Sequence, residues 1–170
     1  FIERCLQLLK PGGRLAIVLP DSILSNPGLA FIRRWILKRA RIIASVDLPQ
    51  VTFEPYTGTQ TSVLLLQKKT HEEMLIEQET GKPRDYEIFM TTPEAVGHDR
   101  RGEAHYLRTP EGELIEYEDT ITVTRRNPSG QLITERRQQK VREKFDQLPE
   151  VVRYFTEWIS KTDRMRWLND

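Results

Sequence analysis

An aromatic loop between two apolar stretches is the part of the sequence with the clearest capacity for chemistry. The loop runs from Pro49 to Gly58 and carries Phe53 and Tyr56, although a turn between strands needs no aromatic side chains. An aromatic face can stack on a nucleobase extruded from a duplex, and such stacking contributes roughly 1 to 3 kcal/mol. A hydrophobic plug tucked under the loop is the alternative. Phe53 is the first candidate for such stacking and Tyr56 the second, and the loop by itself leaves the choice between stacking and plug open.

A second stretch with polar and titratable residues covers positions 96–102. His98 and Asp99 are adjacent there, and adjacent side chains of an extended chain point in opposite directions, so we expect no acid–base pair. The spacing of His71, His98 and His105 matches no zinc template. We therefore predict a structural or DNA-contacting loop and neither a catalytic nor a metal site.

Basic residues are concentrated in a few segments, although the formal net charge is only +1. Arg34, Lys38 and Arg41 are expected on the solvated face of a helix, close to its C-terminus. Other clusters suit the phosphate groups of nucleic acid, because the distribution of charge matters more than its sum. The predicted phosphate contacts are Arg100, Arg101, Arg125, Arg126 and Lys140.

Three apolar runs are expected to form the sheet that positions these loops. They are Leu15 to Leu19, Ile42 to Leu48 and Ser62 to Leu66. Runs of this length without alternation are typical of strands buried on both faces of an α/β sheet. A helix-length segment separates the first two, which indicates a βαβ crossover, whereas only a loop separates the last two. We therefore expect the last two strands to be antiparallel.

The end of the first strand carries Asp21 and Ser22, directly after Pro20. Open α/β sheets bind their ligands at the carboxyl ends of the strands, so these two residues are expected near any active cleft. A strand-end turn and helix cap is the simpler interpretation, and we favour it.

Helices are predicted on both sides of this region. Phe1 to Leu9 has helical spacing, and Asn26, followed by proline, is typical of a helix start. Leu148 to Ile159 carries an apolar stripe, which Trp158 and Trp167 would extend, and this helix should dock on the sheet or on a partner.

The region between the sheet and the last helix is more polar, and its elements are predicted from short patterns. The predictions are a surface loop at His71–Asp85, a short strand at Tyr86–Met90, a loose hairpin at Tyr106–Glu118, a second hairpin pairing Ile121–Arg125 with Gln131–Glu135, and a basic, helix-permissive segment at Arg136–Lys144.

The ordered motifs resemble a known family. They read Leu-Lys-Pro-Gly-Gly-Arg, Val-Leu-Pro-Asp-Ser, Asp-Leu-Pro, Phe-Glu-Pro and Thr-Ser-Val-Leu-Leu-Leu-Gln-Lys-Lys. This series resembles the C-terminal half of the catalytic domain of N6-adenine DNA methylases, in particular the modification subunits of type I restriction-modification systems. The resemblance covers Phe1 to Gly102, most strongly Leu9 to Lys69, and includes a Gly-x-Asp-x-x-Gly stretch at positions 97–102.

The resemblance implies an α/β fold: the C-terminal half of a Rossmann-like methyltransferase sheet, with parallel strands plus an antiparallel terminal hairpin, followed by a smaller β-rich and helical extension. It implies S-adenosylmethionine as the cofactor of the intact enzyme and places Phe53 at the position that stacks on the flipped adenine. Family members bind the cofactor at a Gly-rich strand-to-helix turn and hold the target amine with an Asn-Pro-Pro-aromatic tetrapeptide. Neither motif occurs in these 170 residues. We therefore expect a fragment that binds no cofactor and is inactive alone.

The expected partners follow from the same resemblance. They are double-stranded DNA, specificity and nuclease subunits or domains, and the missing N-terminal half of the same protein. The chain begins with Phe, so we interpret it as a cut through a longer protein, and the bare edge of the first strand predicts either a homodimer of the fragment or rearranged packing at that edge. Two alternatives are a non-catalytic nucleic-acid-binding or subunit-docking module with a methylase-like fold, and a methylase acting on RNA or a small molecule.

Composition narrows the setting of the protein. A single cysteine excludes an internal disulfide, and no apolar run reaches the roughly 20 residues of a membrane span. We expect a cytoplasmic protein without membrane contact. The expected organisation is a methyltransferase segment at residues 1–70, a polar extension at 71–144 and a C-terminal helix at 145–170.

Overall fold

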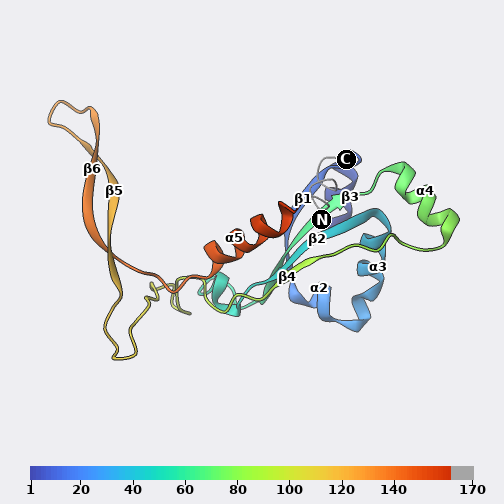
Figure 1. Cartoon of the computed structure of the whole chain (residues 1–170), viewed down its shortest axis with the longest axis horizontal. Helices are drawn as coiled ribbons and strands as arrows, with labels where there is room; N and C mark the ends of the chain where they lie inside the picture. The colour runs from blue at the N-terminus through green and yellow to red at the C-terminus, as the bar shows by residue number, and fades with distance from the viewer. Residues whose placement is uncertain (162–170) are drawn as a thin grey trace.

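Four strands form one mixed sheet in a computed structural model that describes residues 1–161 (Figure 1). The strands are β1 (Arg14–Pro20), β2 (Ala40–Asp47), β3 (Thr61–Lys68) and β4 (Phe89–Thr91), and their order is β1-β3-β2-β4. β3 is antiparallel to both β1 and β2, whereas β4 is parallel to β2. The predicted antiparallel pairing of the last two apolar runs is therefore confirmed, and the fold is α/β.

The crossover between β1 and β2 joins two strands that are not neighbours, because β3 lies between them in the sheet. β1 and β2 run in the same direction because both are antiparallel to β3, and α3 (Ala30–Arg39) connects them. β3 lies between them and supplies the centre of the core, with Leu64 and Leu66 almost fully buried.

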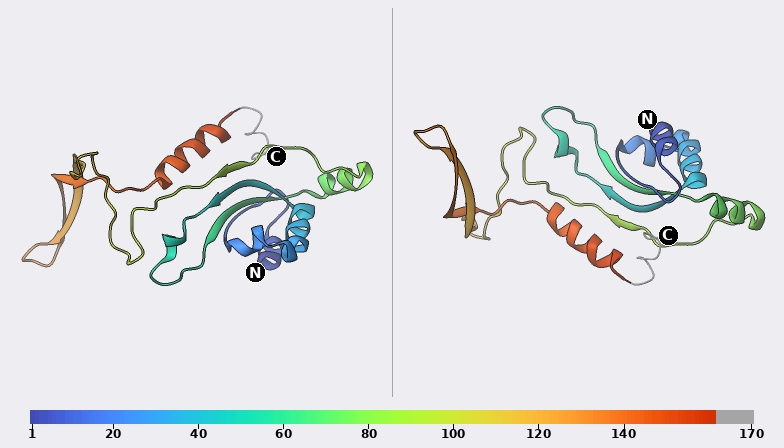
Figure 2. Two further views of the ribbon diagram at one scale, coloured as in Figure 1. Left: turned by 90° about the horizontal axis from the view of Figure 1, so that it is seen from below. Right: turned by 90° about the horizontal axis from the view of Figure 1, so that it is seen from above.

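Helices cover the two sides of this sheet. The core cluster joins Leu6 of α1 (Ile2–Leu8) and Ile36 of α3 to side chains of β1 and β3. Figure 2 shows α1, α2 (Asp21–Ser25) and α3 on one side and α5 (Leu148–Ile159) beside β4 on the other. α5 packs on β4 through Phe155, whose ring lies 5.4 Å from that of Phe89. The predicted docking of the last helix is thus confirmed for the described part, and Trp167 lies outside the described residues.

The start of α3 follows the predicted cap with one modification. The Asn26 side chain accepts a hydrogen bond of 2.8 Å from the amide of Gly28. The first turn after it is a 3₁₀ helix, η1 (Pro27–Leu29), and the α-helix begins at Ala30.

The predicted surface loop at residues 71–85 is wrong for most of its length, because His71–Thr80 forms the helix α4. A capping box begins it: Thr70 accepts from the amide of Glu73, whose carboxylate accepts from the amide of Thr70. Gly81 ends it in the left-handed conformation, with φ of 65°. The helix carries no apolar stripe, so its periodicity does not reveal it.

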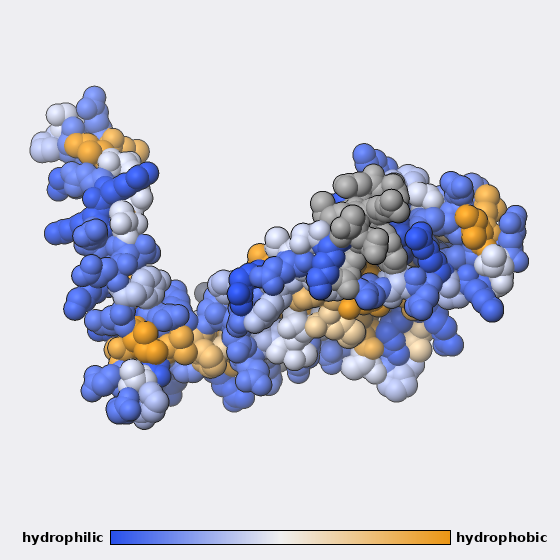
Figure 3. Space-filling model, viewed as in Figure 1, coloured by the Kyte–Doolittle hydropathy of each residue, from blue (hydrophilic) through white to orange (hydrophobic). Residues whose placement is uncertain are grey.

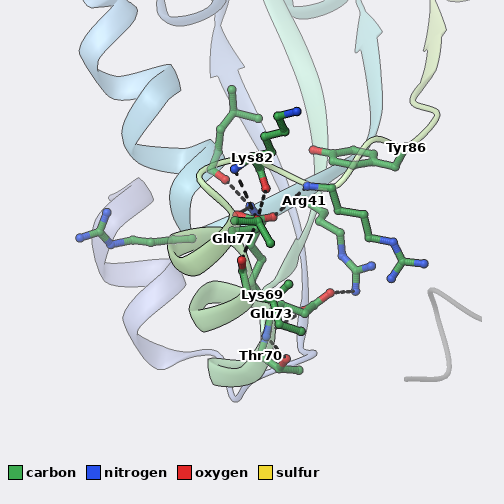
Figure 4. A network of polar contacts seen from close by, with 12 residues as sticks. Arg41, Lys69, Thr70, Glu73, Glu77, Lys82 and Tyr86 are labelled. Carbon is green, nitrogen blue, oxygen red and sulfur yellow. Dashed lines mark hydrogen bonds and ion pairs between the residues drawn. The ribbon is translucent and has the colours of Figure 1, made fainter.

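Two buried cations hold α4 on the domain (Figure 4). The ammonium of Lys69, only 3% exposed, lies 2.7 Å from Glu77 and donates to the carbonyl of Leu37 at 2.7 Å. Arg41 lies 3.0 Å from Glu73. The expectation that Arg41 lies on a solvated helix face is therefore wrong, since this residue belongs to β2 and is 5% exposed.

A long two-stranded ribbon projects away from the sheet (Figures 1 and 2). It consists of β5 (Glu116–Arg126) and β6 (Leu132–Arg142), which pair along their full length. The predicted second hairpin is confirmed and is longer than expected. The helix-permissive interpretation of Arg136–Lys144 is wrong, because cross-strand pairing with β5 fixes an extended backbone as far as Arg142.

No helix among residues 1–161 combines the length and apolar character needed to cross a membrane.

Candidate functional site

Two loops meet at the carboxyl end of the sheet. β2 continues into η2 (Gln50–Phe53), and β4 continues toward the loop at positions 96–104. The carboxyl ends of parallel strands meet at one edge, which is where α/β sheets bind ligands. A pocket of about 610 Å³ lies between these loops. Its lining residues are Thr52, Phe53, Glu54, Pro55, Tyr56, Val96, Gly97, His98, Arg101, Gly102, Ala104, Lys144 and Asp146.

Backbone hydrogen bonds fix the aromatic wall of the pocket. The carbonyl of Phe53 accepts from the amides of Tyr56 and Thr57, both at 3.0 Å. The Thr52 hydroxyl donates to the carbonyl of Pro49 at 2.6 Å, and the Gln50 side chain donates to the carbonyl of Gly58 at 3.1 Å. Phe53 therefore presents a partly covered ring, 38% exposed, on a fixed backbone, whereas Tyr56 is 95% exposed.

Asp99 organises the opposite loop. One of its carboxylate oxygens accepts from the amides of Arg101 and Glu103, at 2.8 and 2.9 Å. These backbone donors, that of Glu103 first, lower the pKa of Asp99. Both loop glycines adopt positive φ, 78° at Gly97 and 81° at Gly102. Asp99 thus acts on its own loop, and His98 contacts the Asp99 carbonyl and not its carboxylate.

Charged side chains surround the aromatic wall. Arg101 and Lys144 line the pocket. Arg100 is largely exposed and lies 3.8 Å from Glu54, whose side chain is 16% exposed. The geometry brings four predicted residues into one region: Phe53, Tyr56, Arg100 and Arg101.

Sequence reasoning did not place Glu54, Lys144 or Asp146 at this site. Glu54 directly follows Phe53 in the aromatic loop, and this adjacency in the sequence was the signal that could have placed it at the site. Lys144 and Asp146 reach the pocket through long-range pairing, such as the bridge between Val96 and Asp146, for which the sequence carries no local signal.

The other predicted residues lie elsewhere. Asp21 and Ser22 form the first turn of α2, directly after β1, and do not line the pocket. The predicted strand-end position is confirmed, whereas the predicted cap is wrong, because the N-cap position is Pro20 and no side chain caps this helix. Arg125, Arg126 and Lys140 lie on the β5–β6 ribbon, where Arg125 pairs with Glu135 at 2.7 Å. Residues 1–161 contain no group of three or more side chains arranged to hold a metal ion.

A family model described as N-6 DNA Methylase matches residues 1–99, and the chain therefore belongs to the N-6 DNA methylase family. Over 69 residues it is 33% identical to the type I restriction enzyme EcoEI methylase subunit of Escherichia coli. This match covers 40% of the chain and 14% of the relative. The predicted resemblance to the type I restriction-modification methylases is confirmed.

Two further comparisons give similar, partial matches. The chain is 32% identical over 69 residues to the defense against restriction protein B of Escherichia phage P1, covering 40% of the chain and 3% of that protein. A crystal structure of a putative class I S-adenosylmethionine-dependent methyltransferase from Listeria monocytogenes aligns with a TM-score of 0.42 at 26% identity. That alignment covers 54% of the chain and 25% of the other protein. The chain thus spans a small share of the curated relatives it matches.

Proposed function

We propose that the chain is part of a DNA methyltransferase that transfers the methyl group of S-adenosylmethionine to adenine N6 in a restriction-modification system. In this proposal residues 1–70 supply three strands of the C-terminal half of a Rossmann-like catalytic sheet, and the extension at residues 71–144 adds β4 to it. Within the expected closing segment at residues 145–170, α5 packs on β4, and residues 162–170 lie outside the described part. One observation carries the assignment: the ring of Phe53 lines a pocket of about 610 Å³ at the carboxyl end of the sheet, beside Arg101 and Lys144.

The pocket suits an extruded base. Its volume lies in the range of small-molecule sites. Phe53 offers an aromatic face on a fixed backbone, which compensates for the stacking that a base loses on leaving the duplex. Arg101 and Lys144 supply positive charge for the neighbouring phosphates, and the exposed Arg100 extends it.

The residues present do not fit the cofactor. The junctions after β1, β2 and β3 read Pro20-Asp21, Leu48-Pro49 and Lys69-Thr70, so none of these three turns offers a glycine-rich backbone cradle. The Asn-Pro-Pro-aromatic tetrapeptide is also absent from the sequence. We infer that the intact protein binds S-adenosylmethionine and holds the target amine with residues outside this chain. Specificity and nuclease subunits or domains would complete the system.

The function is tested in the intact protein with Phe53→Ala. Loss of stacking worth roughly 1 to 3 kcal/mol predicts a 5- to 150-fold lower methylation efficiency on unmethylated DNA, measured by transfer of labelled methyl groups. Phe53→Tyr should retain most activity. Phe31→Ala on α3 is the matched control, because Phe31 is 62% exposed and lies outside the pocket.

Two results would contradict the proposal. Equal methylation by Phe53→Ala and Phe31→Ala would remove the stacking role. If the intact protein transfers no methyl group to DNA and lacks both cofactor and amine-holding motifs, the chain would instead be a docking or nucleic-acid-binding module. Calorimetric titration of the isolated chain with S-adenosylmethionine completes the test, since micromolar binding would contradict the assignment of the cofactor site to other residues.

A further inference from the structure

The β5–β6 ribbon is a surface that the pocket does not explain. Each strand has 11 residues, which corresponds to a ribbon of about 36 Å, close to one turn of B-form DNA. Both faces of the ribbon are exposed along nearly its whole length. An isolated two-stranded hairpin is marginally stable in water, so a ribbon of this length indicates a surface that another molecule covers.

Charge is distributed unevenly along the ribbon. The distal part, residues 121–137, contains four arginines and one glutamate, a net charge of +3. The part near the domain, residues 116–120 and 138–142, contains three acids and two bases, a net charge of −1. The basic part is therefore the part farthest from the sheet.

The two faces of the ribbon differ in chemistry. Side chains alternate between faces, so the register places Arg126, Arg136, Lys140 and Arg142 together with three threonines of β5 and one of β6. Glu116 pairs with Arg142 at 3.3 Å, and Glu118 lies opposite Lys140. No acidic side chain within residues 1–161 pairs with Arg126 or Arg136. We call this surface the basic face.

The opposite face is less suited to a protein partner. Its rows pair Ile121 with Arg137 and Val123 with Glu135, and its one apolar pair, Tyr117 with Val141, lies at the end of the ribbon near the domain. Figure 3 shows a ribbon dominated by hydrophilic side chains, with a small apolar group near the tip. A stable protein interface requires a continuous apolar centre, which these alternating rows do not provide.

The ribbon originates at the wall of the pocket. The amide of Leu107 donates to the carbonyl of Glu143, and Tyr106 bridges to Lys144, which lines the pocket two residues after the end of β6. A duplex with one base in the pocket would therefore have its flanking turn within reach of the ribbon.

We propose that the β5–β6 ribbon lies along a groove of duplex DNA and binds the sugar–phosphate backbone through Arg126 and Arg136 of the basic face. The major groove of B-form DNA is about 12 Å wide and admits a two-stranded ribbon, and arginine and threonine side chains are common phosphate ligands. The contact is independent of sequence and holds the duplex beside the pocket. This inference rests on the proposed function, because it takes the duplex to be the substrate of the same site.

The test measures binding of the intact protein to a short random-sequence DNA duplex by fluorescence anisotropy over a series of salt concentrations. Each phosphate contact contributes about 0.9 to the slope of log affinity against log salt. Arg126→Gln with Arg136→Gln should weaken binding and reduce that slope by about 1 to 2 units. Arg126→Lys with Arg136→Lys keeps the charge and should restore the slope.

The matched control is Arg34→Gln with Lys38→Gln, which removes the same charge from exposed positions of α3. It should leave the slope unchanged. An equal loss in both double variants would overturn the proposal, because it would reflect net charge alone. An unchanged slope in Arg126→Gln with Arg136→Gln would overturn it as well, as would an absence of duplex binding by the unmodified protein.

The same samples separate this proposal from the proposed function. Methyl transfer to DNA with an unchanged slope overturns the ribbon contact only. Ribbon-dependent binding without methyl transfer supports the ribbon contact and contradicts the function. A ribbon that docks a protein would give a third result. Ile121→Ser with Val123→Ser would then dissociate a subunit in size-exclusion chromatography, and Arg126→Gln with Arg136→Gln would keep the salt slope of the unmodified protein. This combination overturns the DNA contact.

Discussion

The buried pair of Lys69 and Glu77 should stabilise α4 and its attachment to the domain, and Glu77→Gln tests this directly. The substitution keeps the size of the side chain and removes its charge. The ammonium of Lys69, 3% exposed, then loses its only carboxylate partner among the described residues and keeps the neutral carbonyl of Leu37 at 2.7 Å. That carbonyl lies in the last turn of α3, where helical carbonyls lack intrahelical partners.

The magnitude follows from the exposure of both partners. Removing one member of a buried ion pair costs about 3 to 5 kcal/mol. The side chain of Glu77 is 19% exposed, and the amide oxygen of glutamine can still accept from Lys69, so both effects reduce the loss. We expect Glu77→Gln to lower the free energy of unfolding by about 2 to 3 kcal/mol.

The assay is urea denaturation followed by circular dichroism. Glu79→Gln is the matched control: it makes the same chemical change on the same helix at an exposed position and should stay within about 0.5 kcal/mol of the unmodified chain. The double variant Lys69→Met with Glu77→Leu should recover most of the loss, because an apolar pair leaves no buried charge. If Glu77→Gln matched Glu79→Gln, the buried pair would contribute no net stability and the reasoning would be refuted.

Three further predictions concern protonation and association. Burial raises the pKa of Tyr86 above 10.0, so this tyrosine ionises first in the unfolded chain, and the free energy of unfolding should fall as the pH rises above 10. Tyr86→Phe should flatten this decline, measured by urea unfolding between about pH 8 and 11. Backbone donors lower the pKa of Asp99, so its contribution is present above pH 3.8 and is lost in acid. The protection of the Arg101 and Glu103 amides, measured as exchange relative to an unstructured peptide at the same pH, should therefore fall as the pH falls, and Asp99→Asn should abolish that pH dependence. β1 is an edge strand and Val18 is 49% exposed, so the isolated chain should dimerise in sedimentation at high concentration, and Val18→Lys should reduce dimerisation. A monodisperse monomer of the unmodified chain at high concentration would contradict this.

Local patterns in the sequence were sufficient to locate the first three strands of the sheet and the aromatic loop that lines the candidate pocket. Each of the first three strands contains an apolar run, interrupted in β2 by Ser45, and the length of the segment between runs limits their relative direction. Phe53 was found because an aromatic residue in a tight loop has no role in turning. These features depend on neighbours within a few residues, and periodicity and turn chemistry describe such neighbours well.

α4 shows an intermediate case. The sequence contains a local helix signal, the capping box of Thr70 and Glu73 followed by Gly81, but no apolar stripe supports it. Its attachment depends on Lys69 and Arg41, two cations that become buried only when β2, β3 and α3 are assembled. Composition alone therefore predicts a solvated loop.

Only the tertiary structure decided which distant residues complete the pocket and the ribbon. Residues 136–142 consist mostly of arginine, glutamine and lysine, which are good helix formers, and pairing with β5 nevertheless selects the strand. Lys144 and Asp146 reach Phe53 because the chain returns along residues 96–107 after the excursion through β5 and β6. Such contacts join segments separated by some 40 to 90 positions, and their stability comes from cross-strand hydrogen bonds that form only when both segments are in place.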